Sequence, residues 1–195
     1  PLVGQEHATE GIVVGDFQIG GKDGYYIQDA TGDTDSLTSD GVFVYDITLD
    51  VNPGDHVRVR GTVVEYFDLT EISPVTQVWV CSTGNTIAPT ELSLPVTDVT
   101  EFEQYEGMLV TIPQDLTISE YFNFGRYGEI KLTTTRYMTY TAANEPDVAG
   151  YSAWTAQYAS NSITLDDGRS FQNPDPAIHP NGSEFTLTNL FRGGD

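Results

Sequence analysis

The stretch that decides the fold is NPGDHVRVRGTVVE, residues 52–65. Its opening Asn-Pro-Gly-Asp predicts a turn, because proline fixes one backbone dihedral and glycine supplies the other. Val57 and Val59 then alternate with Arg58 and Arg60, so one face of a strand over 56–65 meets a core and the other carries charge. The glycine that follows lies mid-strand, where a small barrel bends or bulges.

Similar short runs rich in β-branched and aromatic residues lie on both sides of this strand. They cover residues 7–16, 24–29, 41–45, and 69–73 continued by 77–80, and clusters of Gly, Asp, Asn and Pro separate them. Five strands in the first half of the chain, with a long second turn, predict an OB-type Greek-key barrel. Helical periodicity is confined to 144–160, so the fold class is all-β.

A second, related β-unit is expected after the barrel. We assign residues 1–88 to the OB-fold-like barrel, 89–104 to a linker and 105–195 to the second unit, with strands near 115–120, 128–133 and 163–165. The segment LTNLFRGGD at 187–195 echoes ITLDVNPGD at 47–55, which introduces the central strand of the barrel. This echo predicts an internal repeat whose second copy lacks its final hairpin, leaving an open edge for a missing segment or a neighbouring chain.

Composition limits the classes of partner. The chain has 195 residues with 8 Lys+Arg against 29 Asp+Glu, a net charge of −21. Bulk charge therefore cannot hold DNA, and nucleic-acid contact needs a local basic or stacking surface or bridging cations. No run of 18 apolar residues exists, so no membrane partner is expected.

The same composition bears on the compartment of the protein. A single cysteine, Cys81, excludes an internal disulfide framework and a multi-Cys zinc site. High acidity with two lysines and eleven tyrosines favours a secreted, extracellular protein over an acidic cytosolic domain. The chain opens at Pro1 without a methionine or a signal-peptide pattern, so we expect a mature or excised piece of a longer protein.

Several motifs resemble the OB-fold region of bacterial multidomain extracellular endonucleases of the ExeM/NucH type. They are GIVVGDF at 11–17, GYYIQD at 24–29, SDGVFV at 39–44, YEGM at 105–108 and NFGRYGE at 123–129. In that family the region precedes a metal-dependent nuclease domain. The resemblance implies a secreted, non-catalytic, nucleic-acid-handling module that works with a nuclease domain in the same or another chain.

Three groups of residues are candidate sites. The acidic turn with Asp29, Asp33, Asp35 and Asp40 could converge on calcium or magnesium, although an ordinary turn whose carboxylates cap backbone amides is the simpler explanation. The aromatic and arginine side chains of an outer strand face could bind nucleic acid, the rings by stacking on bases and the arginines by contacting phosphate. Alternatively, the aromatic residues could fill the interior of the barrel. This group comprises Tyr26, Phe43, Tyr45, Arg58, Arg60, Tyr66 and Trp79. An aromatic–arginine cluster favours an interface or packing role; it comprises Tyr121, Phe122, Phe124, Arg126 and Tyr127.

No catalytic residues are assigned. The three histidines, His7, His56 and His179, show no metal-ligand spacing, and Cys81 is expected to be a small buried residue or to pair outside the chain. We therefore expect a non-catalytic OB module that binds single-stranded DNA by stacking and local arginine contacts, with calcium as a candidate aid to binding. The alternative is a structural subunit of an extracellular filament, completed by strand exchange between chains.

Overall fold

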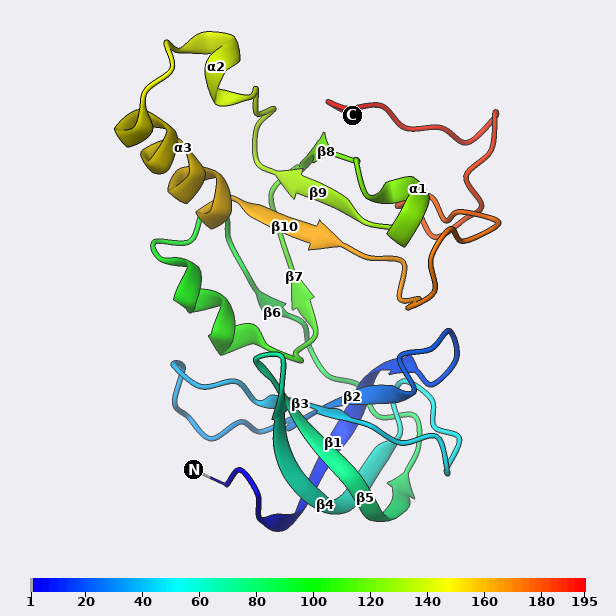
Figure 1. The fold of residues 1–195 in the computed structure, drawn as a ribbon. Helices are drawn as coiled ribbons and strands as arrows, with labels where there is room; N and C mark the ends of the chain where they lie inside the picture. The colour runs from blue at the N-terminus through cyan, green and yellow to red at the C-terminus, as the bar shows by residue number, and fades with distance from the viewer. Residues whose placement is uncertain (1) are drawn as a thin grey trace. The chain divides into compact units, whose positions relative to one another are not determined.

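A computed structural model describes residues 2–195 of the chain, which form two compact units (Figure 1). The first unit comprises residues 2–92 and 100–111, and the second comprises residues 93–99 and 112–195. In this part of the chain, none of the helices combines the length and the apolar character that crossing a bilayer requires.

The first unit is a closed five-stranded barrel. Its strands are β1 (Glu6–Phe17), β2 (Gly24–Gln28), β3 (Gly41–Val44), β4 (His56–Tyr66) and β5 (Leu69–Ser82). They close in the order β1-β2-β3-β5-β4, because β4 also pairs with β1. The pairing of β3 with β5 is parallel. This is the Greek-key connectivity of an OB-fold, so the predicted fold class and all five predicted strands are confirmed.

The alternation in β4 builds the barrel core as expected. Val57 and Val59 are fully buried and pack with Val13, Tyr25 and Ile72, whereas the two arginines between and after them are exposed. The pairing of β4 with β5 shifts register around the mid-strand glycine. A Cβ on that glycine would lie 2.6 Å from Cγ2 of Ile72, so only glycine allows the two strands to approach this closely.

Residues 100–111 belong to the barrel unit, whereas we expected the second unit to begin at residue 105. A 3₁₀ helix, η1 (Val99–Tyr105), leads into β7 (Val110–Thr111), which pairs in parallel with β6 (Thr90–Glu91). Hydrogen bonds that are distant in sequence hold this segment to the barrel. For example, the amide of Leu109 donates to Oε1 of the buried Gln28 at 2.9 Å.

The second unit carries a three-stranded antiparallel sheet in the order β10-β9-β8. Its elements are β8 (Thr117–Glu120), α1 (Phe124–Tyr127), β9 (Ile130–Thr133), α2 (Tyr140–Ala143), α3 (Val148–Ser160) and β10 (Ser162–Leu165). Its core joins Ile118, Phe124 and Ile130 with the rings of Phe185 and Phe191. Helix α3 lies within the stretch predicted to be helical, and the Asp147 carboxylate caps its first turn.

Candidate nucleic-acid interface

The outer face of β1, β4 and β5 brings the predicted arginines together with one predicted aromatic residue. Glu10, Arg58 and Trp79 lie directly opposite one another on the three adjacent strands. Directly opposed residues of antiparallel strands share a face of the sheet, and the valines between the arginines face inward. We call this surface the Arg58 wall; it comprises Glu6, Glu10, Arg58, Arg60, Gln77 and Trp79.

Each arginine of the Arg58 wall has a carboxylate partner on β1. Nη1 of Arg58 lies 3.4 Å from Oε1 of Glu10, and Nη2 of Arg60 lies 2.9 Å from Oε2 of Glu6. Hydrogen bonds from Thr76 and then from Arg60 hold the pKa of the Glu6 carboxyl below its ordinary value. About half of each of these four side chains is exposed to solvent, so a phosphate can reach either guanidinium by competing with a glutamate.

Trp79 supplies the exposed ring of this surface. Its exposed fraction is 47%, and it stands across from Arg58. A base stacked on an exposed aromatic ring beside a guanidinium gains both stacking and a phosphate contact. Nε2 of His56 lies 3.6 Å from Oε2 of Glu10, so the imidazole and Arg58 both lie beside this carboxylate at the end of the wall.

Tyr26 and Phe43 point outward from β2 and β3 but do not form an open stacking platform. Their rings pack together with centroids 4.8 Å apart, and Phe17 packs edge-on against Tyr26 at 5.8 Å. Phe43 is only 5% exposed, because its ring also covers the backbone of Gly24. The expectation that Phe43 offers a face to a base is therefore wrong.

The chain itself covers the face of β2 and β3, which is the face that OB-folds commonly use for oligonucleotides. The hydroxyl of Ser39 donates to the carbonyl oxygen of Glu106 at 2.5 Å, and the amide of Thr70 donates to the Glu106 carboxylate at 2.8 Å. A Cβ on Gly107 would lie 3.2 Å from Cδ1 of Tyr26. Beside this segment remains a recess of about 320 Å³, lined by Val14, Gly15, Phe17, Tyr26, Gly107, Met108 and Leu109.

Tyr45 and Tyr66 are exposed but belong to other parts of the barrel. Tyr66 packs edge-on against Phe67, which is 89% exposed at the tip of the β4–β5 turn. That tip lies eight residues along β4 from Arg58, about 25 Å of extended strand. The seven predicted residues thus separate into an outer wall, a covered aromatic cluster and two exposed tyrosines. The sequence analysis did not include Phe67 among the exposed aromatic residues. Its position in a two-residue hairpin turn was the available sign that its ring would be exposed.

The carboxylates of the acidic turn cap backbone amides. Asp29 accepts from the amide and the hydroxyl of Thr31, Asp33 accepts from the amide of Asp35, and Asp40 accepts from the amide of Asp33. Hydrogen bonds from Thr31 lower the pKa of Asp29. In residues 2–195, no three His, Cys, Asp or Glu side chains gather as a metal site would require. This geometry matches the simpler of the two explanations, an Asx-type turn.

The aromatic–arginine cluster of the second unit divides between core and surface. Phe124 is a core residue that packs against Phe185 and Phe191 with centroids 5.0 and 4.8 Å away, so it cannot serve an interface. Phe122 is almost fully exposed and Tyr121 is half exposed. The guanidinium of Arg126 lies over the half-buried ring of Tyr127 and donates to the Gln172 side chain.

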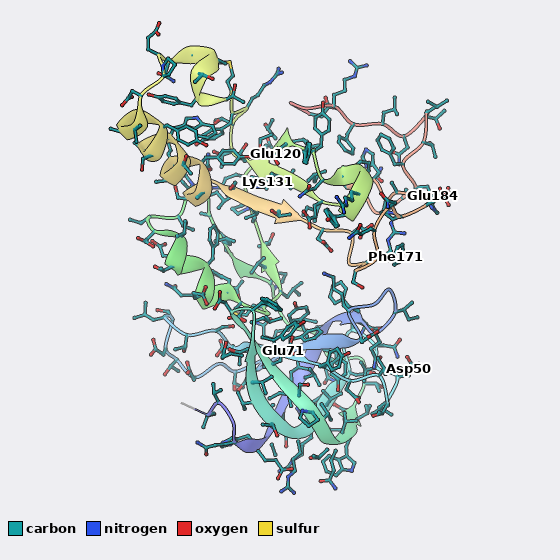
Figure 2. All side chains as sticks on the ribbon, viewed as in Figure 1. Asp50, Glu71, Glu120, Lys131, Phe171 and Glu184 are labelled. Atoms are coloured by element: carbon teal, nitrogen blue, oxygen red, sulfur yellow. The ribbon has the colours of Figure 1, made fainter. Side chains whose placement is uncertain are left out.

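A second aromatic group was not recognised in the sequence. The rings of Tyr151, Trp154 and Tyr158 stack along one face of α3 with centroids 6.0 and 5.3 Å apart, and Nζ of Lys131 lies over Tyr158. Figure 2 shows Lys131 on β9, and Glu120 is its cross-strand partner on β8. The spacing of three and four residues between the rings was the available signal.

Comparison with known proteins adds little to this geometry. No family model and no curated protein matches the chain. Among solved structures it is similar to the hypothetical protein ygiW from E. coli, with a TM-score of 0.28 and 24% identity over 39% of this chain and 74% of that one. Of the two expectations for Cys81, burial is wrong, because the side chain is exposed on β5, and pairing with a cysteine outside the chain stays a prediction.

Proposed function

We propose that the chain is a non-catalytic OB-fold module that binds single-stranded nucleic acid on the Arg58 wall. The observation that carries the proposal is the register that sets Arg58 directly across from Trp79 on the outside of a closed barrel. In a chain of net charge −21, this surface combines an exposed ring with two guanidinium groups. Secretion and association with a nuclease domain form part of the same proposal, and they rest on the composition and on the motif resemblance.

The binding mode follows from the charges around the wall. A phosphate replaces the Glu10 carboxylate at Arg58 while the adjoining base stacks on Trp79, a contact worth about 1–3 kcal/mol per base. The acidic surface elsewhere repels the strand, so calcium or magnesium ions act as counterions between protein and nucleic acid. Affinity therefore rises on addition of millimolar divalent cation at constant ionic strength.

The test is fluorescence anisotropy with a labelled oligothymidine, with and without calcium. Arg58→Ala and Trp79→Ala should each weaken binding, Trp79→Ala by about 5- to 150-fold. Tyr66→Ala, on the far hairpin tip, is the matched control and should leave affinity unchanged. If the wild-type chain fails to bind in every buffer, or if all three variants bind alike, the proposal is wrong.

A structural role is the second candidate function. The observation that favours it is the sheet of the second unit, in which β10 is an edge strand within residues 2–195, whereas the backbone of Ile118 on β8 already bonds Gly194 and Asp195. Edge strands present backbone groups that another chain can pair with. Electron microscopy of the purified chain would reveal filaments if identical copies complete one another, whereas dispersed particles would oppose this role.

A further inference from the structure

Two tyrosine rings meet at the N-terminal end of α3 in the second unit. Tyr140 begins α2 and Tyr151 lies in the first turn of α3, and Figure 1 shows α2 beside this end of α3. The ring centroids are 5.9 Å apart and the ring planes are inclined by 71°, so the two rings form the walls of a corner. Tyr151 is 55% exposed, which leaves part of its ring open to solvent.

The chain holds both rings in place. The hydroxyl of Tyr140 donates to Oδ2 of Asp147 at 2.7 Å. A Cβ on Gly150 would collide with this hydroxyl, so only glycine allows the ring to lie across the first turn of α3. Trp154 stacks on Tyr151 with a centroid distance of 6.0 Å and an interplanar angle of 18°. The corner therefore exists before any ligand arrives.

A recess of about 350 Å³ lies in this corner, and its lining is mostly apolar. The lining residues are Tyr140, Thr141, Pro146, Asp147, Val148 and Tyr151. The carboxylate of Asp147 is the one charged group among them. It accepts hydrogen bonds from the amides of Ala149 and Gly150, so the first-turn N–H groups that would attract an anion already have a partner.

The electrostatics of the recess favour a cation. The hydrogen bond from the Tyr140 hydroxyl, and then that from the Gly150 amide, hold the pKa of the Asp147 carboxyl below its ordinary value. This carboxyl group is therefore ionised at neutral pH. Glu145, two residues before it, is exposed, and the whole chain carries a net charge of −21. A positive ion near this end of α3 is attracted by the nearby carboxylates and by the field of the chain.

The apolar lining decides which class of cation fits. Calcium takes six to eight oxygen ligands, which a recess with one carboxylate does not supply. A primary ammonium group carries three N–H donors that need acceptors. A methylated ammonium group instead presents its charge through methyl groups. Such a group is held by aromatic rings through cation–π attraction and by contact with apolar side chains.

We propose that this corner, which we call the Tyr140–Tyr151 site, binds a methylated ammonium group such as the trimethylammonium group of choline. The two tyrosine rings contact the methyl groups, and the carboxylate of Asp147 balances the positive charge. Pro146 and Val148 complete the apolar lining. The inference goes beyond both candidate functions, because it depends neither on nucleic-acid binding nor on pairing between β-strands.

The test is isothermal titration calorimetry of the whole chain with choline chloride, at an ionic strength held constant with sodium chloride. We expect saturable binding to one site. The neutral isostere 3,3-dimethylbutan-1-ol has the same shape without the charge, so it should bind about tenfold more weakly or less tightly still. Absence of saturable choline binding, or equal binding of the neutral isostere, would overturn the proposal.

Variants of the chain identify the site. Tyr151→Leu keeps an apolar side chain but removes the ring, so it should weaken choline binding by about 2- to 30-fold, whereas Tyr151→Phe should bind as the wild type does. Asp147→Asn should also weaken binding, since it removes the charge but can still cap α3. Phe122→Ala, which removes an almost fully exposed ring elsewhere in the unit, is the control, and circular dichroism verifies that every variant folds. Equal affinity of Tyr151→Leu and Tyr151→Phe, or of Asp147→Asn and the wild type, would overturn the proposal.

Sedimentation with lipid vesicles identifies the source of the ammonium group. Binding to phosphatidylcholine vesicles but not to phosphatidylglycerol vesicles, with loss of binding in Tyr151→Leu, would support the site and assign its ligand to a lipid head group. Choline binding without sedimentation would support the site and assign its ligand to a free ion.

Discussion

Glu10→Gln is expected to tighten the binding of single-stranded DNA, because Glu10 competes with phosphate for Arg58. The carboxylate lies 3.4 Å from Nη1 of Arg58 and both side chains are about half exposed. Breaking an exposed ion pair of this kind costs about 0.2–1 kcal/mol. Repulsion between the carboxylate and a phosphate about 6 Å away in water adds about 0.7 kcal/mol.

Together these terms correspond to an affinity gain of about five- to eighteenfold at low ionic strength. The measurement is a titration of labelled oligothymidine with the wild type, with Glu10→Gln and with Asp50→Asn. Asp50→Asn removes an exposed charge from the loop between β3 and β4, so it corrects for the change in net charge. Most of the gain should disappear when the salt concentration is raised, because exposed charges are screened.

A double-mutant cycle separates competition at Arg58 from general repulsion. In an Arg58→Ala background the ion-pair term no longer exists, so Glu10→Gln should retain only the smaller repulsive effect. An unchanged gain in that background, or a gain equal to that of Asp50→Asn, would show that Glu10 does not act through Arg58. Either result would refute the assignment of the Arg58 wall as the binding surface.

Three further predictions concern the barrel. Burial raises the pKa of the Glu71 carboxyl group (Figure 2). The free energy of unfolding should therefore fall as the pH rises above about 4.5, the pKa of this group in the unfolded chain. In urea titrations, Glu71→Gln should be more stable than the wild type at pH 7 but not at pH 4. Ile72→Val should lower the free energy of unfolding by about 0.5–1.5 kcal/mol in the same assay. In Gly41→Ala the new Cβ would lie 2.5 Å from the carbonyl carbon of Gly107, so hydrogen exchange of the Leu109 amide should become faster. Gly125→Ala is the control: its new Cβ meets no atom within 4 Å, and exchange should not change.

The barrel could be predicted from the sequence because local patterns show where its strands begin and which face of a strand is buried. Alternation at 57–60 fixes which face of β4 is inside, and the turn before it fixes where the strand begins. The echo between 47–55 and 187–195 could also be found in the sequence, and both Gly-Asp endings exchange backbone hydrogen bonds with a strand residue, Val13 in the first case and Ile118 in the second. These signals are local, so one sequence is enough to read them.

The covering of the face of β2 and β3 could not be predicted, because it depends on contacts between residues that are far apart in the sequence. Glu106 meets Ser39 and Thr70 across long separations in sequence, and nothing in the local pattern of 105–109 indicates that contact. The sequence alone therefore cannot separate an aromatic residue that is available for stacking from one that is covered, as Phe43 is. Likewise, alternation indicates that Arg58 is exposed but cannot indicate that Glu10 lies beside it.

The Arg58 wall depends on the β4–β5 hairpin. Arg58, Arg60 and Trp79 all lie on β4 and β5, the hairpin for which the second sheet has no counterpart in the described residues. Within residues 2–195 the sheet of the second unit therefore carries no second wall of this kind, and these residues should bind one short oligonucleotide, which the stoichiometry of an oligothymidine titration measures.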